Sequence, residues 1–562
     1  MNFKRFTRRL RSRFFRLRRL GKLRLFLGLI TFAAAVAFHL TIATNLVDEQ
    51  PDDSKLYIQL ARNVVEQGVF SGKTEAPYSP TLIRTPGYPF FLAGVYEIVG
   101  TGNEKAVRVS QALVFTLACI LAGLIASQWT IDRRRKTKAA FIAFVLAAFC
   151  PFMVVYSATI LAETLTMFFL AATILSATYA LKARKRQRAF VWWVAAGLLA
   201  GCNVLIRPDA GLFAFGIGLT LVISVFFGRG MFRARVLDRF FKGVAFTLAF
   251  IMPLAPWTIR NERLFGVFQP LSPAHAEMPG EFVPHGYFLW LKTWIDDSRY
   301  IGPMLWNLEK HPIRIDDVPP SAFSSDEERA RIAALLDQYN NSDPEHPMTP
   351  PKRADKSDAD DANGKDSADN DKNDDSGDND SADKGDEEDS GDGPQWDLKI
   401  TPDVDAGFAA IANERIARDP WRYYVWLPAK RSQSMWFDTH SDFYPFSGEL
   451  LPLTSLDNDK DQQVWLPLFA AMNLIYTLLA LAGLLVLLFI RRERAWLWLV
   501  FALAISLPRI IFFGTIENPE PRYFVELFIP AAILGAVFLA YGSFRRQRGS
   551  IGIEVNYGSG EI

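Results

Sequence analysis

The chain has 562 residues, half of which are hydrophobic, and its 62 basic and 60 acidic side chains nearly cancel. The acidic residues concentrate between Asp355 and Asp392, whereas the basic residues cluster at the N-terminus and in short connections between apolar runs. Several of these runs approach the ~20 residues that a helix needs to cross a bilayer, which excludes an ordinary soluble enzyme. The three cysteines lie in apolar runs, so the sequence predicts neither a disulfide framework nor a cysteine-based metal site.

Apolar runs of helical length follow one another along most of the chain. We predict transmembrane helices near residues 24–45, 107–129, 139–158, 161–181, 189–206, 210–227, 243–259, 465–490, 495–513 and 523–542. The basic stretches fall on alternate connections, which the positive-inside rule assigns to the cytoplasm. The first run is too long for a signal peptide, so we expect an uncleaved anchor behind a basic cytoplasmic N-terminus, residues 1–23. The predicted fold class is mainly α, a polytopic transmembrane helical bundle of about ten spans with a cytoplasmic tail at 543–562.

The first outer loop, residues 46–106, belongs to a transmembrane module at 24–259. It contains an amphipathic pattern of apolar residues that ends at Gly68. This pattern predicts a helix that lies along the membrane surface.

A large outer-face insert, residues 260–464, precedes the C-terminal transmembrane helices at 465–542. Within the insert, residues 340–394 are rich in Asp, Ser, Gly and Asn, and we predict that they form a disordered acidic linker. Helical spacing of apolar residues returns on both sides of this linker, at 324–339 and 405–418. The insert is therefore expected to be folded on either side of the linker.

Ionisable residues of the predicted spans gather near their outer ends, which indicates a shared polar cavity at that level. Asp52 and Asp53 open the predicted surface helix. A carboxylate at this point either caps the helix or accepts the proton of an acceptor hydroxyl as a general base. The two interpretations are compatible if the adjacent acids divide the roles.

Arginines on the outer side can stabilise the negative charge of a phosphate leaving group. For each of them taken singly, contact with lipid headgroups is the alternative. The candidates are Arg84, Arg207, Arg260 and Arg522. The histidines show no metal-binding spacing and there is no glycine-rich phosphate loop, so the sequence argues against an ATP-driven pump.

Short motifs occur at these same positions and in a consistent order. They are Asp53-Ser-Lys-Leu-Tyr57, Arg84-Thr-Pro86-Gly87-Tyr88-Pro89, Leu161-Ala-Glu163-Thr164, Arg207-Pro208, Pro256-Trp257-Thr-Ile-Arg260-Asn261 and Arg522-Tyr523. With them the chain resembles the polytopic GT-C glycosyltransferases, particularly the branch that contains the protein O-mannosyltransferases and the aminoarabinose transferase that modifies lipid A. The resemblance covers most of the membrane portion.

The resemblance implies an inverting glycosyltransferase that moves a hexose or pentose from a polyprenyl-phosphate carrier to a hydroxyl on the outer, periplasmic or luminal, face of the membrane. It implies Asp53 as the catalytic base, with Asp52 as the alternative, and Glu163 as a second acid that orients the acceptor or the sugar. For substrate binding it implies Tyr57, Arg84, Arg207, Arg260 and Arg522.

The expected location is the bacterial inner membrane, in the cell envelope. The expected partners are the bilayer, the carrier-linked sugar donor and a protein, lipid or glycan acceptor, with no nucleic acid. The sequence identifies no metal ligands and leaves open whether a divalent metal takes part. The alternative function is a polyprenyl-lipid flippase or transporter, which would place charges near the bilayer midplane, where His39 is the main polar residue of this chain.

Overall fold

The computed structural model describes residues 26–45, 51–227, 231–342, 398–440, 444, 446–456, 460–490 and 493–541. The predicted basic N-terminus, the cytoplasmic tail and nearly all of the predicted acidic linker lie outside these ranges. Within them helices dominate, and β structure is limited to two isolated bridges, Asp438 to Glu449 and Leu450 to Leu453. The predicted mainly α fold class is confirmed.

Nine helices of the described residues are long and apolar enough to cross a membrane. They are Phe26–Asn45, α4 (Glu104–Trp129), α7 (Glu163–Lys182), α8 (Arg186–Ile206), the segment Pro208–Phe226 around α9 (Gly211–Ile223), α10 (Phe232–Phe265), α15 (Lys460–Phe489), α16 (Glu493–Gly514) and the segment Pro521–Tyr541 around α17 (Phe528–Tyr541). A tenth is added if α5 (Lys136–Ala148) and α6 (Pro151–Ala158), which are bent by 58° relative to each other, form one broken span. The chain is therefore a multi-pass membrane protein. Nine of the ten predicted spans coincide with these helices, whereas the one predicted at 139–158 is divided into α5 and α6.

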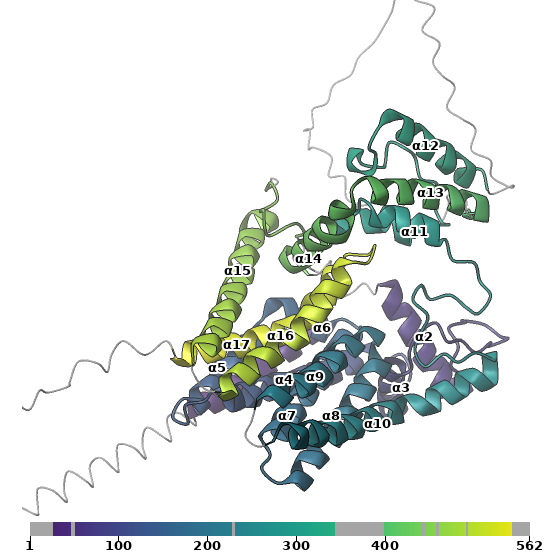
Figure 1. Ribbon diagram of the computed structural model, residues 1–562. Coiled ribbons are helices and arrows are strands. Elements are labelled where there is room, and N and C mark those ends of the chain that lie inside the picture. Colours follow the sequence, from purple (N-terminus) through teal and green to yellow (C-terminus); the bar gives the residue numbers. More distant parts are fainter. Residues whose placement is uncertain are drawn as a thin grey trace, which may run out of the picture. The chain divides into compact units, whose positions relative to one another are not determined.

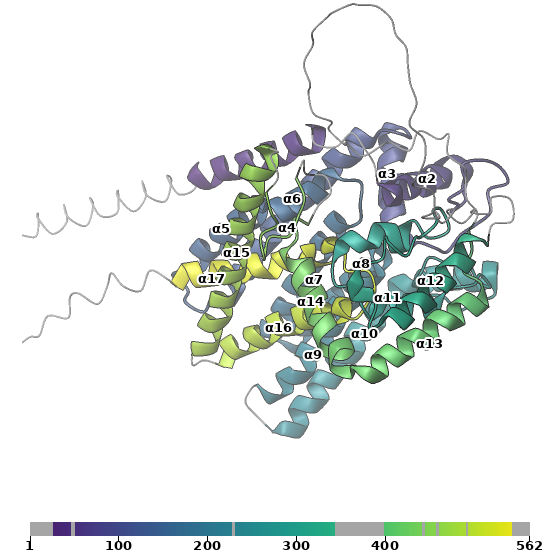
Figure 2. The same cartoon turned by 90° about the horizontal axis from the view of Figure 1, so that it is seen from above.

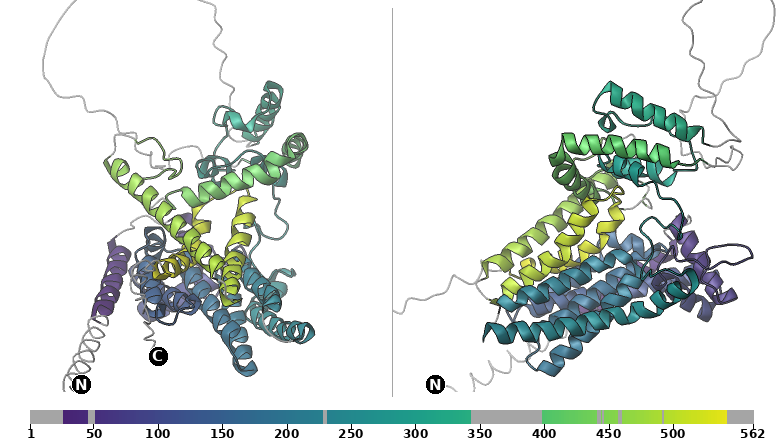
Figure 3. Two further views of the ribbon diagram at one scale, coloured as in Figure 1. Left: turned by 60° about the vertical axis from the view of Figure 1, so that its left-hand side comes forward. Right: turned by 45° about the vertical axis from the view of Figure 1, so that its right-hand side comes forward.

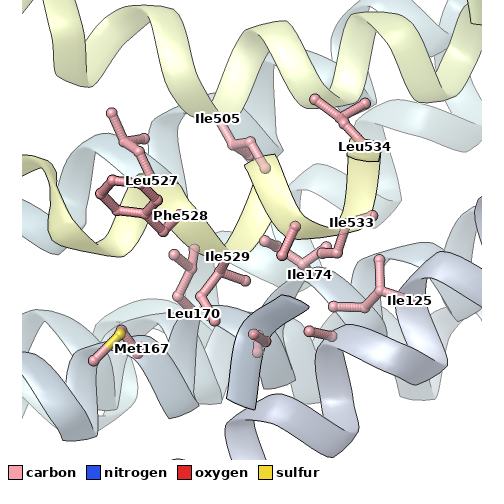
Figure 4. Packing of buried hydrophobic residues seen from close by; sticks show 14 of the residues in the cluster. Ile125, Met167, Leu170, Ile174, Ile505, Leu527, Phe528, Ile529, Ile533 and Leu534 are labelled. Carbon is pink, nitrogen blue, oxygen red and sulfur yellow. The ribbon is translucent and has the colours of Figure 1, made fainter. Parts of the chain in front are cut away.

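Helix α17 is apolar on all sides and is almost completely buried, as expected of a helix that turns no face toward lipid. It packs against α4, α5 and α15 (Figure 2). Figure 4 shows its Ile529 and Ile533 beside Leu170 and Ile174 of α7 in the apolar core. Because η7 (Pro521–Leu527) leads directly into α17, this core fixes the position of the charged residues in η7.

Helices α8 and α10 lie side by side (Figures 1 and 3). A Cβ atom at Gly197 or Gly201 of α8 would collide with the carbonyl oxygen of Phe246 or Phe250 of α10. Small residues one turn apart allow transmembrane helices to approach this closely. The contact holds the C-terminal half of α8, which Arg207 follows.

The predicted first outer loop forms two helices, α2 (Asp52–Gln67) and α3 (Gly87–Val99). Helix α2 ends at Gly68, which has a φ of 68° and so adopts the left-handed conformation that favours glycine. The predicted helix and its end are confirmed. The capping role predicted for the adjacent acids is wrong, because Pro51 occupies the N-cap position and Asp52 and Asp53 lie in the first turn without a side-chain cap.

Helix α3 begins tightly against the end of α8. A Cβ atom at Gly87 would lie 2.6 Å from the carbonyl oxygen of Leu205, so only glycine fits without a shift of the backbone. This contact brings the segment that carries Arg84 close to the segment that carries Arg207.

The chain divides into two compact units, and the first contains all the spans described above. The second unit consists of Pro284–Trp294 and Arg299–Pro420, within the insert predicted at 260–464. Its helices are α11 (His285–Lys292), α12 (Asp326–Asn340) and α13 (Pro402–Arg418), coloured teal to green in Figure 1. Helices α12 and α13 confirm the two helices predicted on either side of the linker. The rings of Tyr287 and Trp290 lie 5.1 and 4.9 Å from that of Phe408 and form the core of this unit.

Candidate active site

Three distant segments of the first unit meet at the carboxylate of Asp53. Arg84, in the loop between α2 and α3, donates from Nη2 to Oδ1 at 2.7 Å. Arg522, in η7, donates from Nη1 to Oδ2 at 2.9 Å. The three side chains are about a quarter exposed, at 25%, 26% and 24%, so the site is sheltered but open to a ligand. Each carboxylate oxygen of Asp53 thus has its own guanidinium partner.

The two arginines decide the protonation state of Asp53. Burial alone would raise its pKa, but the positive charges of Arg522 and Arg84 and their hydrogen bonds outweigh burial and lower the pKa to about 2. The carboxylate is therefore ionised at neutral pH and bound to cations on both sides.

Asp52 occupies a different environment from its neighbour. Its side chain is 83% exposed and forms an ion pair of 3.2 Å with Lys55 on the outer side of α2. Adjacent residues of a helix point about 100° apart, so only one of the two acids can face the arginines. The structure places Asp53 in that position.

Glu163 and Arg207 form a second charged pair next to the first. Glu163 is the first residue of α7 and is only 1% exposed, and its Oε1 accepts a hydrogen bond from Nη1 of Arg207. Arg207 also donates from Nε and Nη2 to the two carboxylate oxygens of Asp209, at 3.1 Å each. The other oxygen of Glu163, Oε2, is buried and has no hydrogen-bond partner among the described residues. It is free to accept a hydrogen bond from a ligand.

Arg509 is completely buried and supports Arg207 through their shared partner Asp209. Its Nη2 donates to Asp209 at 2.7 Å and to Glu526 at 3.0 Å, and its Nε donates to the carbonyl oxygen of Tyr523 at 2.6 Å. The rings of Phe213 and Phe513 lie 4.7 and 4.8 Å from its guanidinium carbon. Arg509 therefore joins α9, α16 and η7.

These supporting residues are not among the site residues assigned from the sequence. Their only signal there is an ionisable side chain close to the end of an apolar run, at Asp209, Arg509 and Glu526. Glu520 gives no such signal. In the structure it forms an ion pair with Nε of Arg522 and accepts a hydrogen bond of 2.8 Å from Tyr523, so it orients the arginine that reaches Asp53.

Tyr57 stands between the two charged pairs. Its ring packs edge-on against Tyr88, with the centroids 4.9 Å apart, and its hydroxyl has no hydrogen-bond partner among the described residues. Burial, and then the negative charge of Asp53, raise the pKa of Tyr57 to about 12. The hydroxyl therefore stays protonated and can donate a hydrogen bond to a bound ligand.

Arg260 lies apart from both pairs, near the C-terminal end of α10. Its Nη1 donates to the carbonyl oxygen of Thr81 and to Oδ1 of Asn261, both at 2.8 Å. The rings of Trp257 and Phe70 lie 4.6 and 5.6 Å from its guanidinium carbon. In the part of the chain that the structure describes, no carboxylate forms an ion pair with it.

The predicted site residues thus fall into groups. The structure joins Asp53 to Arg84 and Arg522, and Glu163 to Arg207, with Tyr57 between them, whereas Asp52 and Arg260 contact neither pair. In the described ranges no three His, Cys, Asp or Glu side chains are arranged to hold a metal ion.

The comparisons with known proteins agree with the sequence motifs. The model of the family "dolichyl-phosphate-mannose-protein mannosyltransferase" matches residues 83–257, which include Arg84, Glu163 and Arg207. This match confirms the predicted resemblance to the protein O-mannosyltransferases. No curated protein sequence matches the chain.

Solved structures of low sequence identity also resemble the chain. ArnT from Cupriavidus metallidurans, bound to undecaprenyl phosphate, is 13% identical with a TM-score of 0.34, over 91% of this chain and 77% of that one. The archaeal oligosaccharyltransferase AglB from Archaeoglobus fulgidus, in complex with an inhibitory peptide and a dolichol-phosphate, is 13% identical with a TM-score of 0.42, over 90% of this chain. The matched region is 50% of AglB, so this chain spans about half the length of that protein.

Proposed function

We propose that this membrane protein, which resembles the protein O-mannosyltransferases, transfers a sugar from a polyprenyl-phosphate carrier to an acceptor hydroxyl at the outer face of the bacterial inner membrane. The observation that supports this most directly is the Asp53 carboxylate held between Arg84 and Arg522, at 2.7 and 2.9 Å. A carboxylate for the acceptor proton and guanidinium groups for a phosphate are the two components that this transfer needs. The description of the matching family supports a lipid-phosphate sugar as the donor.

The proposed reaction is a single displacement at the anomeric carbon. Asp53 accepts the proton of the acceptor hydroxyl while the acceptor oxygen bonds to the anomeric carbon. The bond from that carbon to the carrier phosphate breaks, and its electron pair goes to the phosphate oxygen. Attack from the face opposite the leaving group inverts the configuration. The products are the glycosylated acceptor, the carrier phosphate and protonated Asp53.

Each of the other site residues has a role in this scheme that follows from its contacts. Arg84 and Arg522 stabilise the charge that develops on the phosphate oxygen. The unpartnered Oε2 of Glu163 accepts a hydrogen bond from a hydroxyl of the sugar or the acceptor, and the free hydroxyl of Tyr57 donates one.

Two predicted binding residues act less directly in this proposal. Arg207 holds Glu163 in place. Arg260, which has no carboxylate partner within the described ranges, supplies a further cation for the carrier phosphate near the outer end of α10. None of the proposed steps uses a metal ion.

The function is tested with the purified protein in lipid nanodiscs and a panel of radiolabelled polyprenyl-phosphate hexoses and pentoses, with membrane extract as the source of acceptors. The wild type is expected to transfer label from one donor. Asp53→Asn, which keeps the shape of the side chain but cannot accept the proton, is expected to lose about 100-fold or more of the rate. Asp52→Asn is the matched control, because it removes the same charge one residue away on the exposed side of α2. We expect it to change the transfer rate less than twofold, which corresponds to less than ~1 kcal/mol.

Three results would contradict parts of the proposal. Equal transfer by Asp53→Asn and the wild type would exclude Asp53 as the base. A product with the anomeric configuration of the donor would exclude a single displacement. Absence of transfer from every donor, together with movement of the carrier lipid across the bilayer of vesicles that contain the protein, would favour the flippase alternative.

A further inference from the structure

The carboxylate of Asp53 and the phosphate of a carrier lipid require the same two guanidinium groups. Both oxygens of Asp53 are occupied, one by Arg84 and the other by Arg522. Guanidinium groups bind carboxylates and phosphates through the same pattern of parallel N–H donors. A phosphate that approaches Asp53 closely enough for the transfer therefore has to share these donors with it or take them.

Two other cations near Asp53 already form ion pairs with other carboxylates. Lys55 pairs with Asp52 on the exposed side of α2. Arg207 pairs with Glu163 and with both oxygens of Asp209. The cations left for the phosphate are therefore Arg260, near the C-terminal end of α10, and the two arginines that Asp53 holds.

The contacts of the two arginines allow a change of partner without rearrangement of the helices. Apart from Asp53, Arg84 contacts the carbonyl oxygen of its neighbour Ile83 at 3.3 Å and forms no other ion pair within the described residues. Arg522 uses Nη1 for Asp53 and Nε for Glu520, so Glu520 keeps the side chain in place while Nη1 changes partner.

We propose that Asp53 is a built-in competitor of the carrier phosphate: its carboxylate occupies the two arginines in the empty enzyme and is displaced from them when the donor binds. This proposal rests on the proposed function, because Asp53 is the base of that reaction and Arg84 and Arg522 are its phosphate ligands. In the empty enzyme the base and these ligands are bound to each other. Its consequence is that Asp53 becomes an effective base only after the donor has bound. The acceptor hydroxyl is then activated only when a sugar is in place to receive it.

The electrostatics of the site agree with this exchange. The charged and titratable groups around Asp53 are Arg84 in the loop after α2, Arg522 in η7 and Tyr57 on its own helix, and Glu163 of α7 acts on Arg522 and Tyr57 from the far side. Burial alone raises the pKa of Asp53, and it is the two arginines that bring it down to about 2. When they turn to a phosphate, the pKa rises again and proton acceptance becomes more favourable.

The same competition assists the release of the product. After the transfer the carrier phosphate has gained one negative charge and holds both arginines, while Asp53 carries the acceptor proton. Loss of this proton to water restores the carboxylate, which takes back Arg84 and Arg522 and weakens the hold on the phosphate. The enzyme returns to its resting state without a further reactant.

The experiment measures equilibrium binding of farnesyl phosphate to the full-length protein in nanodiscs, with farnesol as the uncharged probe. Asp53→Asn removes the competitor but keeps the arginines, so we expect it to bind farnesyl phosphate about tenfold or more tightly than the wild type does. The matched control Asp52→Asn is expected to stay within about twofold of the wild type, because its ion pair is exposed. Farnesol is expected to bind equally to all three proteins.

An affinity of Asp53→Asn for farnesyl phosphate that is equal to or weaker than that of the wild type would overturn the proposal. Equal tightening by Asp52→Asn would also overturn it, because the effect would then be one of general charge. A melting curve verifies the fold of Asp53→Asn, and Asp53→Ser provides a second variant in which the competitor is absent and the same tightening is expected. Since no sugar is present, the result is independent of the transfer assay. Tighter binding of farnesyl phosphate by Asp53→Asn, without sugar transfer by the wild type, would support the competition and reject the glycosyltransferase. Sugar transfer by the wild type, without tighter binding by Asp53→Asn, would reject the competition alone.

Discussion

At the scale of single residues, the ion pairs of Asp53 make the stability of the protein depend on pH. The ordinary pKa of this side chain is 3.8, and in the folded protein it is about 2. A carboxylate with a lowered pKa stabilises the folded state fully above the unfolded value and loses this contribution as the pH falls through the folded value. The stabilisation by Asp53 is therefore complete above about pH 4 and disappears toward pH 2, with a size of about 2 kcal/mol.

The measurement compares thermal unfolding of the wild type and Asp53→Asn between pH 7 and pH 2. The difference in melting temperature is expected to favour the wild type at neutral pH and to shrink in the lower part of this range. Asp52→Asn supplies the control, since its exposed ion pair with Lys55 contributes little. A difference between wild type and Asp53→Asn that stays constant at all pH values would show that the two ion pairs do not stabilise the fold.

Sequence motifs identify Asp53, Arg84 and Arg522 as candidates, but they do not show which of two adjacent acids faces the arginines. That depends on the rotation of α2, which is set by packing against α3 and not by the local sequence. The sequence also does not predict the ion pairs that support the site. Arg509 and Asp209 are 300 residues apart, and nothing in either local sequence predicts that they meet.

At the scale of helices, α8 packs closely on α10 through its glycines. Gly201→Ala would place a methyl group against the carbonyl oxygen of Phe250, and we expect a loss of stability of about 1–3 kcal/mol from overpacking. Gly218→Ala on α9 is the control, because a Cβ atom there meets nothing within 4 Å. It is expected to be neutral or slightly stabilising, since alanine favours helix. Equal melting temperatures of the two variants in detergent would contradict the close packing of α8 on α10.

The helices themselves follow well from the sequence, because an apolar run of spanning length has few other solutions in a membrane. The observed helices differ from the predicted spans at the ends of the apolar runs and at a proline. Helix α10 continues from Phe232 to Phe265, beyond the predicted span at 243–259, because the polar residues that flank the apolar run remain helical up to the left-handed C-cap Gly266. The single span predicted at 139–158 is bent by 58° between α5 and α6, where Pro151 disfavours a helical conformation of Cys150.

At the scale of the whole molecule, the predicted acidic linker connects two points that the second unit already holds together. The backbone N–H of Lys399 donates to the hydroxyl of Ser342 at 2.7 Å, so the residues on either side of 343–397 are neighbours. We predict that a short Gly-Ser connection in place of 344–396 leaves the melting temperature and the sugar transfer unchanged, because a short loop closes this distance at a small entropic cost.

Deletion of Pro402–Arg418 is the corresponding control. It removes α13 with Phe408, around which the rings of the second unit pack, and is expected to abolish the fold of that unit. Loss of transfer in the variant with the short connection, at an unchanged melting temperature, would assign the acidic segment a direct part in the reaction. That outcome would contradict its interpretation as a simple linker.

The ion pair between Asp53 and Arg522 joins residues that are 469 positions apart in the chain. During synthesis the ribosome adds Asp53 and Arg84 several hundred residues before Arg522. For most of its translation, therefore, the nascent protein carries the acid and one arginine but not the other. On the proposed mechanism, a polypeptide that stalls or is cut before η7 is inert, so incomplete translation products do not consume carrier lipid or modify neighbouring molecules. Synthesis of η7 thus completes the proposed active site.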